Sequence, residues 1–238
     1  GGLSSNLGYE VRWVLGAVGN NRWIELSSPN QVIQLPQMPQ PEGWRYNRIE
    51  AIPTVHTIPS CAWQVSTKNK QGKFNRSRAI ELGLSDDEKA KLAAGNDIDK
   101  DGHLLLSKDF RGQEIESLSV IISGDTAEMS PGLASVEGCS LLIHEATFLD
   151  DLTKHAQDYL HSTASGAART AIACRAKHLV LTHYGARIKQ TTPSLEEAMT
   201  VLGNSKIGLS AAWDGDRVLV EESGEVSHLY WRDDGWAR

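Results

Sequence analysis

Residues 118–126 read LSVIISGDT and residues 141–148 read LLIHEATF. In each stretch an apolar run ends abruptly in side chains that ionise or bind metals, an aspartate in the first and a histidine–glutamate pair in the second. HLVLTH over residues 178–183 and IGLSAAWDGD over residues 207–216 repeat the pattern. Because polar groups at the carboxyl ends of neighbouring strands converge on one rim of an α/β sheet, these four junctions predict one shared site.

Short apolar runs bounded by turn residues are predicted strands, and periodic segments between them are predicted helices. The strands are Ile49–Val55, Ala62–Val65, Leu118–Ile122, Ser140–Ile143, His178–Leu181, Ile207–Ala212 and Val218–Val220. The helices are Asp86–Ala94, opened by a Ser85/Glu88 capping box, Ser162–Ala176 and Ser194–Leu202. The Pro-rich stretch Pro29–Pro41 is predicted to be an irregular loop. The alternation predicts a layered α/β domain.

Length and charge exclude several classes of protein. The chain has 238 residues, enough for one domain with an appended arm, and a formal net charge of -6, which argues against a surface built throughout for nucleic acid or anionic membranes. No apolar run approaches a membrane span, and residues 1–30 lack a signal-peptide pattern. Three widely spaced cysteines provide neither a disulfide scaffold nor a CxxC zinc clip, which favours a reducing, cytoplasmic location.

Imidazole and carboxylate groups at the predicted rim are ligands that zinc accepts. His56, Asp125 and His183 can share a metal site if their strands are neighbours. His161 stands directly before a helix that Ser162 or Thr163 can cap, where it can give a proton to a leaving group. For each residue taken alone, the alternative is a hydrogen-bonded group at a strand or helix end.

Other catalytic and binding motifs are incomplete or missing in this sequence. Asp97–Gly102 begins like a calcium-binding loop, but Lys108 stands where that loop needs a glutamate, so a polar turn is predicted. The histidine–glutamate pair at 144–145 is no zincin motif, because Phe148 replaces the second histidine. No GxSxG elbow, P-loop or GxGxxG fingerprint occurs.

One basic segment, residues 66–78 (STKNKQGKFNRSR), stands out in this acidic chain. It holds no acidic residue and surrounds Phe74 with cations. Such a segment can follow a phosphate backbone while the aromatic ring stacks on a base, or it can simply face water. The candidate RNA-binding residues are Lys68, Lys70, Lys73, Arg76 and Arg78.

Together the blocks VHTIPS (55–60), SGDT (123–126), HEATF (144–148), HST (161–163) and LTHY (181–184) resemble the C-terminal two-thirds of RNase Z, the tRNA 3′-end processing endonuclease of the metallo-β-lactamase fold. The resemblance implies a metallo-β-lactamase-type αββα sandwich, incomplete in this chain, with residues 66–113 inserted as an RNA-binding arm. It also implies two zinc ions, one held by His56, one by His183, with Asp125 bridging both. His161 would be the general acid, oriented by Glu145.

The chain also departs from that family. The His-x-His-x-Asp-His motif, which supplies the remaining zinc ligands, appears nowhere in residues 1–238, so we expect an N-terminally truncated fragment that binds metal weakly and is inactive. The arm lacks a Gly-Pro pair and carries acidic residues 86–88, which weakens the case for precursor tRNA as partner. Rival hypotheses are a hydrolase of small phosphodiesters or esters on the same scaffold and a non-catalytic RNA- or protein-binding module. Members of the family often form homodimers.

Overall fold

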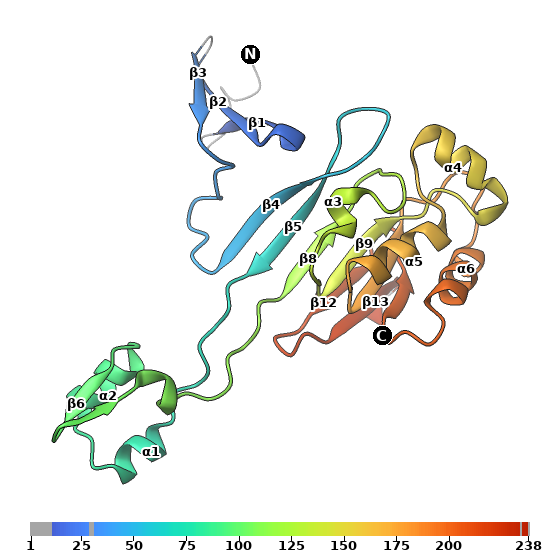
Figure 1. Ribbon diagram of the computed structural model, residues 1–238. Coiled ribbons are helices and arrows are strands. Elements are labelled where there is room, and N and C mark those ends of the chain that lie inside the picture. The colour runs from blue at the N-terminus through green and yellow to red at the C-terminus, as the bar shows by residue number, and fades with distance from the viewer. Residues whose placement is uncertain (1–10, 29–30, 234, 238) are drawn as a thin grey trace. The chain divides into compact units, whose positions relative to one another are not determined.

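The computed structural model describes residues 11–28, 31–233 and 235–237 (Figure 1). The chain divides into two compact units, one formed by residues up to Ser66 together with those from Leu118 onward, and one formed by Thr67–Ser117. The arm was predicted over residues 66–113, and all of it except residue 66 lies in the second unit. No helix in the described part of the chain is long and apolar enough to cross a membrane.

A six-stranded sheet in the order β11-β10-β9-β8-β5-β4 forms the centre of the first unit. Its strands are β4 (Asn47–Pro53), β5 (Cys61–Thr67), β8 (Ser119–Ile122), β9 (Leu141–Glu145), β10 (His178–Thr182) and β11 (Gly208–Ala211). Strands β8 to β11 are parallel, and β5 runs antiparallel to β8. The predicted α/β class is therefore confirmed, with six predicted strands in this sheet.

Helices pack on one face of this sheet (Figure 1). They are α3 (Pro131–Ala134), α5 (Ala164–Ala173) and α6 (Thr192–Leu202). Helix α5 consists largely of alanine and other small residues, so its backbone approaches β9 and β10 closely and joins the core. Thr163 caps it, accepting a hydrogen bond from the Gly166 amide at 3.0 Å. On the opposite face the cross-strand partners Trp63 and Ile122 are 37% and 46% exposed.

Two smaller sheets belong to the first unit. One is β1 (Trp13–Ala17), β2 (Arg22–Ser28) and β3 (Gln31–Leu35), with a 3₁₀ turn η1 (Val18–Asn20); the other is β12 (Arg217–Val220), β13 (Val226–Arg232) and β14 (Gly235–Ala237). The prediction of an irregular loop over 29–41 is wrong for residues 31–35, because the β-branched Val32 and Ile33 pair with β2 and Pro36 comes only after the end of the strand. Residues 29 and 30 lie outside the described part of the chain.

The second unit has its own small core. It contains α1 (Arg76–Glu81), α2 (Asp86–Ala93), β6 (Ile98–Lys100), β7 (His103–Leu105) and η2 (Ser107–Phe110) around Leu92 and Phe110. The predicted capping box of α2 is confirmed, since Ser85 and Glu88 exchange both hydrogen bonds. Asp97–Gly102, the segment that begins like a calcium-binding loop, contains the predicted turn at residues 101–102, where it closes the β6–β7 hairpin.

Candidate metal centre

All five residues predicted for the rim site come together in the first unit. His56 follows β4, Asp125 follows β8, Glu145 ends β9, His161 lies between α4 (Thr153–Tyr159) and α5, and His183 follows β10. A 3₁₀ turn η3 (Asp150–Leu152) leads into α4. The convergence follows from topology, because β8, β9 and β10 are parallel neighbours and end at the same edge.

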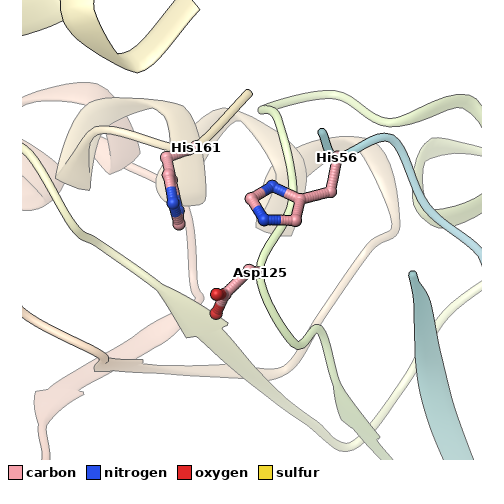
Figure 2. A group of neighbouring side chains, drawn as sticks. All are labelled: His56, Asp125 and His161. Carbon is pink, nitrogen blue, oxygen red and sulfur yellow. The ribbon is translucent and has the colours of Figure 1, made fainter. Parts of the chain in front are cut away.

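The imidazoles and the aspartate approach to within reach of a shared ion. One ligand atom each from His56, Asp125 and His161 lie within 4.8 Å of one another (Figure 2). His183 joins them through Nε2, which is 3.6 Å from Oδ1 of Asp125. Asp125 is thus close both to the His56/His161 pair and to His183.

Glu145 is the buried anchor of the cluster, with only 1% of its surface exposed. Its Oε1 accepts hydrogen bonds from the Thr126 amide (2.8 Å) and from His161 Nδ1 (2.7 Å). Its Oε2 accepts from the Ser162 amide (3.1 Å) and from the amide (3.3 Å) and hydroxyl (2.6 Å) of Thr147. An ionised carboxylate offers about four lone-pair positions, so five donors leave Glu145 little capacity to bind a metal directly. Its geometry is that of an orienting group.

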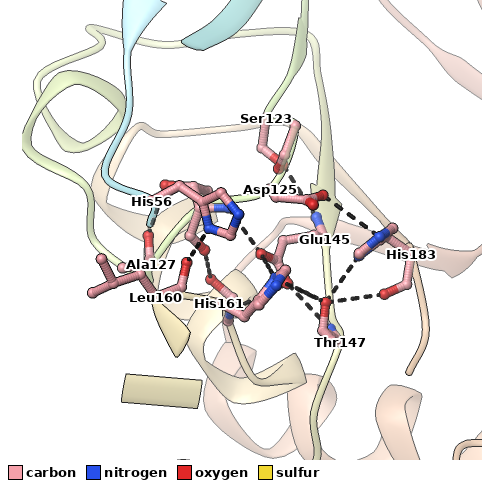
Figure 3. Close-up of polar contacts among 12 residues, drawn as sticks. His56, Ser123, Asp125, Ala127, Glu145, Thr147, Leu160, His161 and His183 are labelled. Atoms are coloured by element: carbon pink, nitrogen blue, oxygen red, sulfur yellow. Dashed lines mark hydrogen bonds and ion pairs between the residues drawn. The ribbon is translucent and has the colours of Figure 1, made fainter. Parts of the chain in front are cut away.

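The hydrogen bonds of two histidines assign their protons. His161 Nδ1 faces the Glu145 carboxylate, and His56 Nδ1 lies 3.0 Å from the carbonyl oxygen of Leu160 (Figure 3). Both partners only accept, so each Nδ1 carries the proton and donates it. The Nε2 atoms of both rings therefore keep their lone pairs, and that of His56 lies 3.5 Å from the hydroxyl oxygen of Thr57. These nitrogens are the atoms that a metal would engage.

Thr147, a residue for which no role was predicted, fixes the proton of His183 on Nδ1 in the same way. Its hydroxyl has one proton, and the shortest contact, 2.6 Å to the ionised Glu145, is the bond that takes it. The hydroxyl oxygen, 2.9 Å from His183 Nδ1, then accepts from that nitrogen, leaving Nε2 free on the side of Asp125. The signals in the sequence are its place in the HEATF block and its position two residues beyond Glu145, past the end of the strand.

Strained backbone surrounds the cluster. His183 and Leu160 adopt left-handed φ values of 53° and 56°, a conformation that costs a residue with a side chain about 1–2 kcal/mol. The turn at Leu160 presents the carbonyl that orients His56. Gly124, with φ of 60°, provides the turn that leads from β8 to Asp125 at no such cost. Strain of this kind gathers where the surrounding fold fixes a functional geometry.

His144 takes no part in the cluster. The side chain is fully buried, and burial lowers the pKa of this imidazole, with partial compensation from the carbonyl and charge of Glu145. Its Nδ1 donates to the Glu145 carbonyl oxygen at 2.8 Å. A neutral histidine enclosed in this way supports β9 from inside, consistent with the absence of a zincin motif.

The five cationic candidates for RNA contact lie elsewhere, in the second unit, and all are exposed. Phe74, the ring that these cations surround in sequence, is half-buried and stacks on Phe110 with centroids 6.3 Å apart, beside the core of that unit. Arg78 is partly structural as well, since its guanidinium donates to the Asp109 carbonyl oxygen at 2.9 Å and covers the Phe110 ring. The basic residues around Phe74 in the sequence suggested an exposed ring, but packing against Phe110 partly buries it.

No model of a protein family matches the chain. Curated proteins named ribonuclease Z do: the protein of Methanosarcina mazei is 32% identical over 201 residues, covering 84% of this chain and 59% of the relative, and that of Ignicoccus hospitalis is 35% identical over 177 residues, covering 74% and 57%. The chain thus spans somewhat more than half the length of these relatives.

Solved structures also match. The metallo-β-lactamase fold protein YhfI of Bacillus subtilis has a TM-score of 0.46 at 18% identity, over 82% of this chain and 54% of that one. The short form of human tRNase Z has a TM-score of 0.38 at 20% identity, over 81% and 45%.

Proposed function

This chain is a relative of the ribonucleases Z, and on that premise we propose that its function is metal-dependent phosphodiester hydrolysis at the 3′ trailer of tRNA precursors. The observation that carries the proposal is the rim cluster. His56, His161 and His183 have Nε2 atoms without a proton near the Asp125 carboxylate, because groups behind each ring hold its Nδ1 proton.

The imidazole nitrogens and the carboxylate of this cluster are ligand types that zinc accepts, so the donor set suits two zinc ions. His56 would bind one ion, His183 the other, and Asp125 both, and the fixed tautomers present the lone pairs that such ligands need. When bound, paired ions polarise the phosphodiester and generate a hydroxide at neutral pH. These donors alone leave each ion short of about four ligands. We therefore propose that the 238 residues by themselves bind zinc weakly and do not turn over.

His161 is proposed as the general acid that protonates the departing oxygen. Its Nδ1–H donates to the buried Glu145 carboxylate, which fixes the ring plane and stabilises a positive charge on it. A second proton, taken from solvent onto the outer Nε2, makes the ring an imidazolium, and this Nε2–H is the proton that the ring can deliver toward the cluster. The alternative, His161 as a third ligand beside His56 and Asp125, uses the same atom and is separated from the acid role by mutation below.

For the substrate, we propose precursor tRNA, with Lys68, Lys70, Lys73, Arg76 and Arg78 of the second unit contributing phosphate contacts. Exposed lysine and arginine side chains favour contacts to the RNA backbone, which position the RNA without reading its sequence. A cytoplasmic location and a homodimer are proposed with the family. The three cysteines, all free thiols, are compatible with a reducing compartment.

The proposal is tested with a precursor tRNA that carries a 3′ extension. The chain, alone and together with any residues encoded ahead of Gly1, is incubated with zinc and the RNA, and the products are mapped at nucleotide resolution. We expect the longer form to cleave at the start of the trailer only in the presence of zinc, and the 238-residue chain alone not to cleave. Hydrolysis of bis(p-nitrophenyl) phosphate without any cleavage of precursor tRNA would favour the small-phosphodiester hydrolase. RNA binding without hydrolysis of either compound would favour the non-catalytic module.

A further inference from the structure

A cavity of about 650 Å³ opens beside the cluster in the first unit. It is bounded by the segment that follows β9, by η3 and α4, and by the turn after β10. Its size is in the range that encloses a small organic ligand. We call it the rim cavity; the residues used below are Thr147, Phe148, Asp151, His155, Tyr159, Gly185 and Arg187, all in its lining.

The rim cavity shares its inner wall with the catalytic groups. Thr147 lines it and also hydrogen-bonds to Glu145 and His183. The Phe148 ring lines it as well and meets the His161 ring edge-on, with centroids 6.1 Å apart. A group in the cavity is therefore separated from the general acid by a single aromatic ring.

A close backbone approach joins the turn after β10 to the segment that follows β9. The Gly185 amide donates to the Thr147 carbonyl oxygen at 3.1 Å, and a Cβ at position 185 would lie 2.5 Å from that oxygen. Only glycine permits this contact. The turn from 185 to 188, closed by a 2.9 Å bond from the Ile188 amide, thus holds Arg187 at the cavity.

The lining has the chemistry of a nucleotide site. Phe148, half-buried, and Tyr159, 58% exposed, offer rings on which a base can stack, and His155 lies 6.5 Å from the Phe148 ring. Arg187 is an exposed cation at the cavity, suited to a phosphate. Asp151 repels phosphate, so the phosphate belongs on the Arg187 side and the base among the rings.

We propose that the rim cavity is a subsite for one unpaired nucleoside of the RNA, adjacent to the bond that is cut, with its base against Phe148 and Tyr159 and its phosphate at Arg187. The inference rests on the proposed function for its choice of RNA. It adds a recognition element within the first unit itself, separate from the cationic residues of the second unit.

The test uses the 238-residue chain and a single-stranded ribotrinucleotide, with ribose 5-phosphate as the probe that lacks a base. Binding is followed by NMR through the amides of Gly185 and Ile188. Tyr159→Ala should raise the Kd for the trinucleotide by about 5- to 150-fold, the effect of losing one base stack. Tyr159→Phe should bind like the wild type. Tyr46→Ala is the matched control, because Tyr46 is a 70% exposed aromatic residue elsewhere in the unit.

Three results would overturn the inference: no trinucleotide binding at these amides, equal binding of ribose 5-phosphate, or an unchanged Kd in Tyr159→Ala. Its failure differs from failure of the proposed function. If a zinc-loaded preparation cleaves precursor tRNA but Tyr159→Ala leaves its KM unchanged, the subsite is wrong and the function stands. If the wild-type chain binds the trinucleotide at the rim cavity but a zinc-loaded form that also carries the residues encoded ahead of Gly1 cleaves no precursor tRNA, the function is wrong and the subsite stands.

Discussion

Replacing Thr147 by valine should separate the support of the cluster from the cluster itself. The change removes one hydroxyl at nearly constant shape and leaves every proposed metal ligand in place. It deletes the 2.6 Å bond to Glu145 and the 2.9 Å contact that holds the Nδ1 proton of His183. We therefore expect effects on stability and on metal binding at the same time.

The size of each effect follows from burial. Glu145 is 1% exposed, so water does not readily replace the lost donor, and a hydrogen bond to a charged group contributes about 1.5–3 kcal/mol to the free energy of unfolding. The His183 side chain is 51% exposed, so water can satisfy its Nδ1 and adds little to that loss. Zinc affinity should fall by about 10- to 100-fold, as it does when a group orienting a ligand is removed.

Urea denaturation measures the first effect, and competition with a fluorescent zinc chelator measures the second. Nitrogen-15 shifts of the imidazoles report directly whether His183 keeps its proton on Nδ1. Thr147→Ser retains the hydroxyl and should behave as the wild type. Thr200→Val removes an exposed helical hydroxyl and should change stability by less than about 0.5 kcal/mol. Wild-type zinc affinity and tautomer in Thr147→Val would refute the reasoning.

Three further predictions concern other groups. In a form of the protein that cleaves RNA, His161→Ala should keep zinc and slow turnover by about 10²–10⁴-fold; loss of zinc would instead make His161 a ligand. Burial, assisted by the charge of the neighbouring His228, lowers the pKa of His178 from its ordinary value of about 6.5. The unfolded chain therefore binds that proton more readily than the folded chain, and the free energy of unfolding should fall as the pH drops below about 6.5. His178→Gln should reduce the fall in urea midpoint between about pH 7.5 and 5.5, and an equal fall in both proteins would count against this prediction. Neutralising Lys68, Lys70 and Lys73 should reduce the salt dependence of RNA affinity measured by filter binding, and an unchanged slope would remove them from the interface.

The sequence was most informative where one local pattern determines the structure. Apolar runs that end in ionisable residues predicted both the central strands and the rim where Asp125 and His183 meet, because parallel strands necessarily end together. The capping box at Ser85 and Glu88 was equally local, since both of its hydrogen bonds lie within one helical turn.

The sequence was less informative where contacts between residues far apart in the chain determine the structure. Strand β3 is short, contains two glutamines and is followed by a proline, and its pairing with β2 gives it its extended form. Phe74 belongs to the core because Phe110, far along the chain, stacks on it. Thr147 gained its role only when Glu145 and His183 were brought to either side of its hydroxyl by neighbouring strands.

The central claim is that Asp125 is shared by the histidines of one metal centre. Its most direct test is zinc titration of this chain, wild type and Asp125→Ala, against a chelator of matched affinity, with Asp99→Ala in the second unit as the control. We predict weak zinc binding by the wild type and by Asp99→Ala, and none by Asp125→Ala. Equal zinc binding by all three proteins would contradict the account.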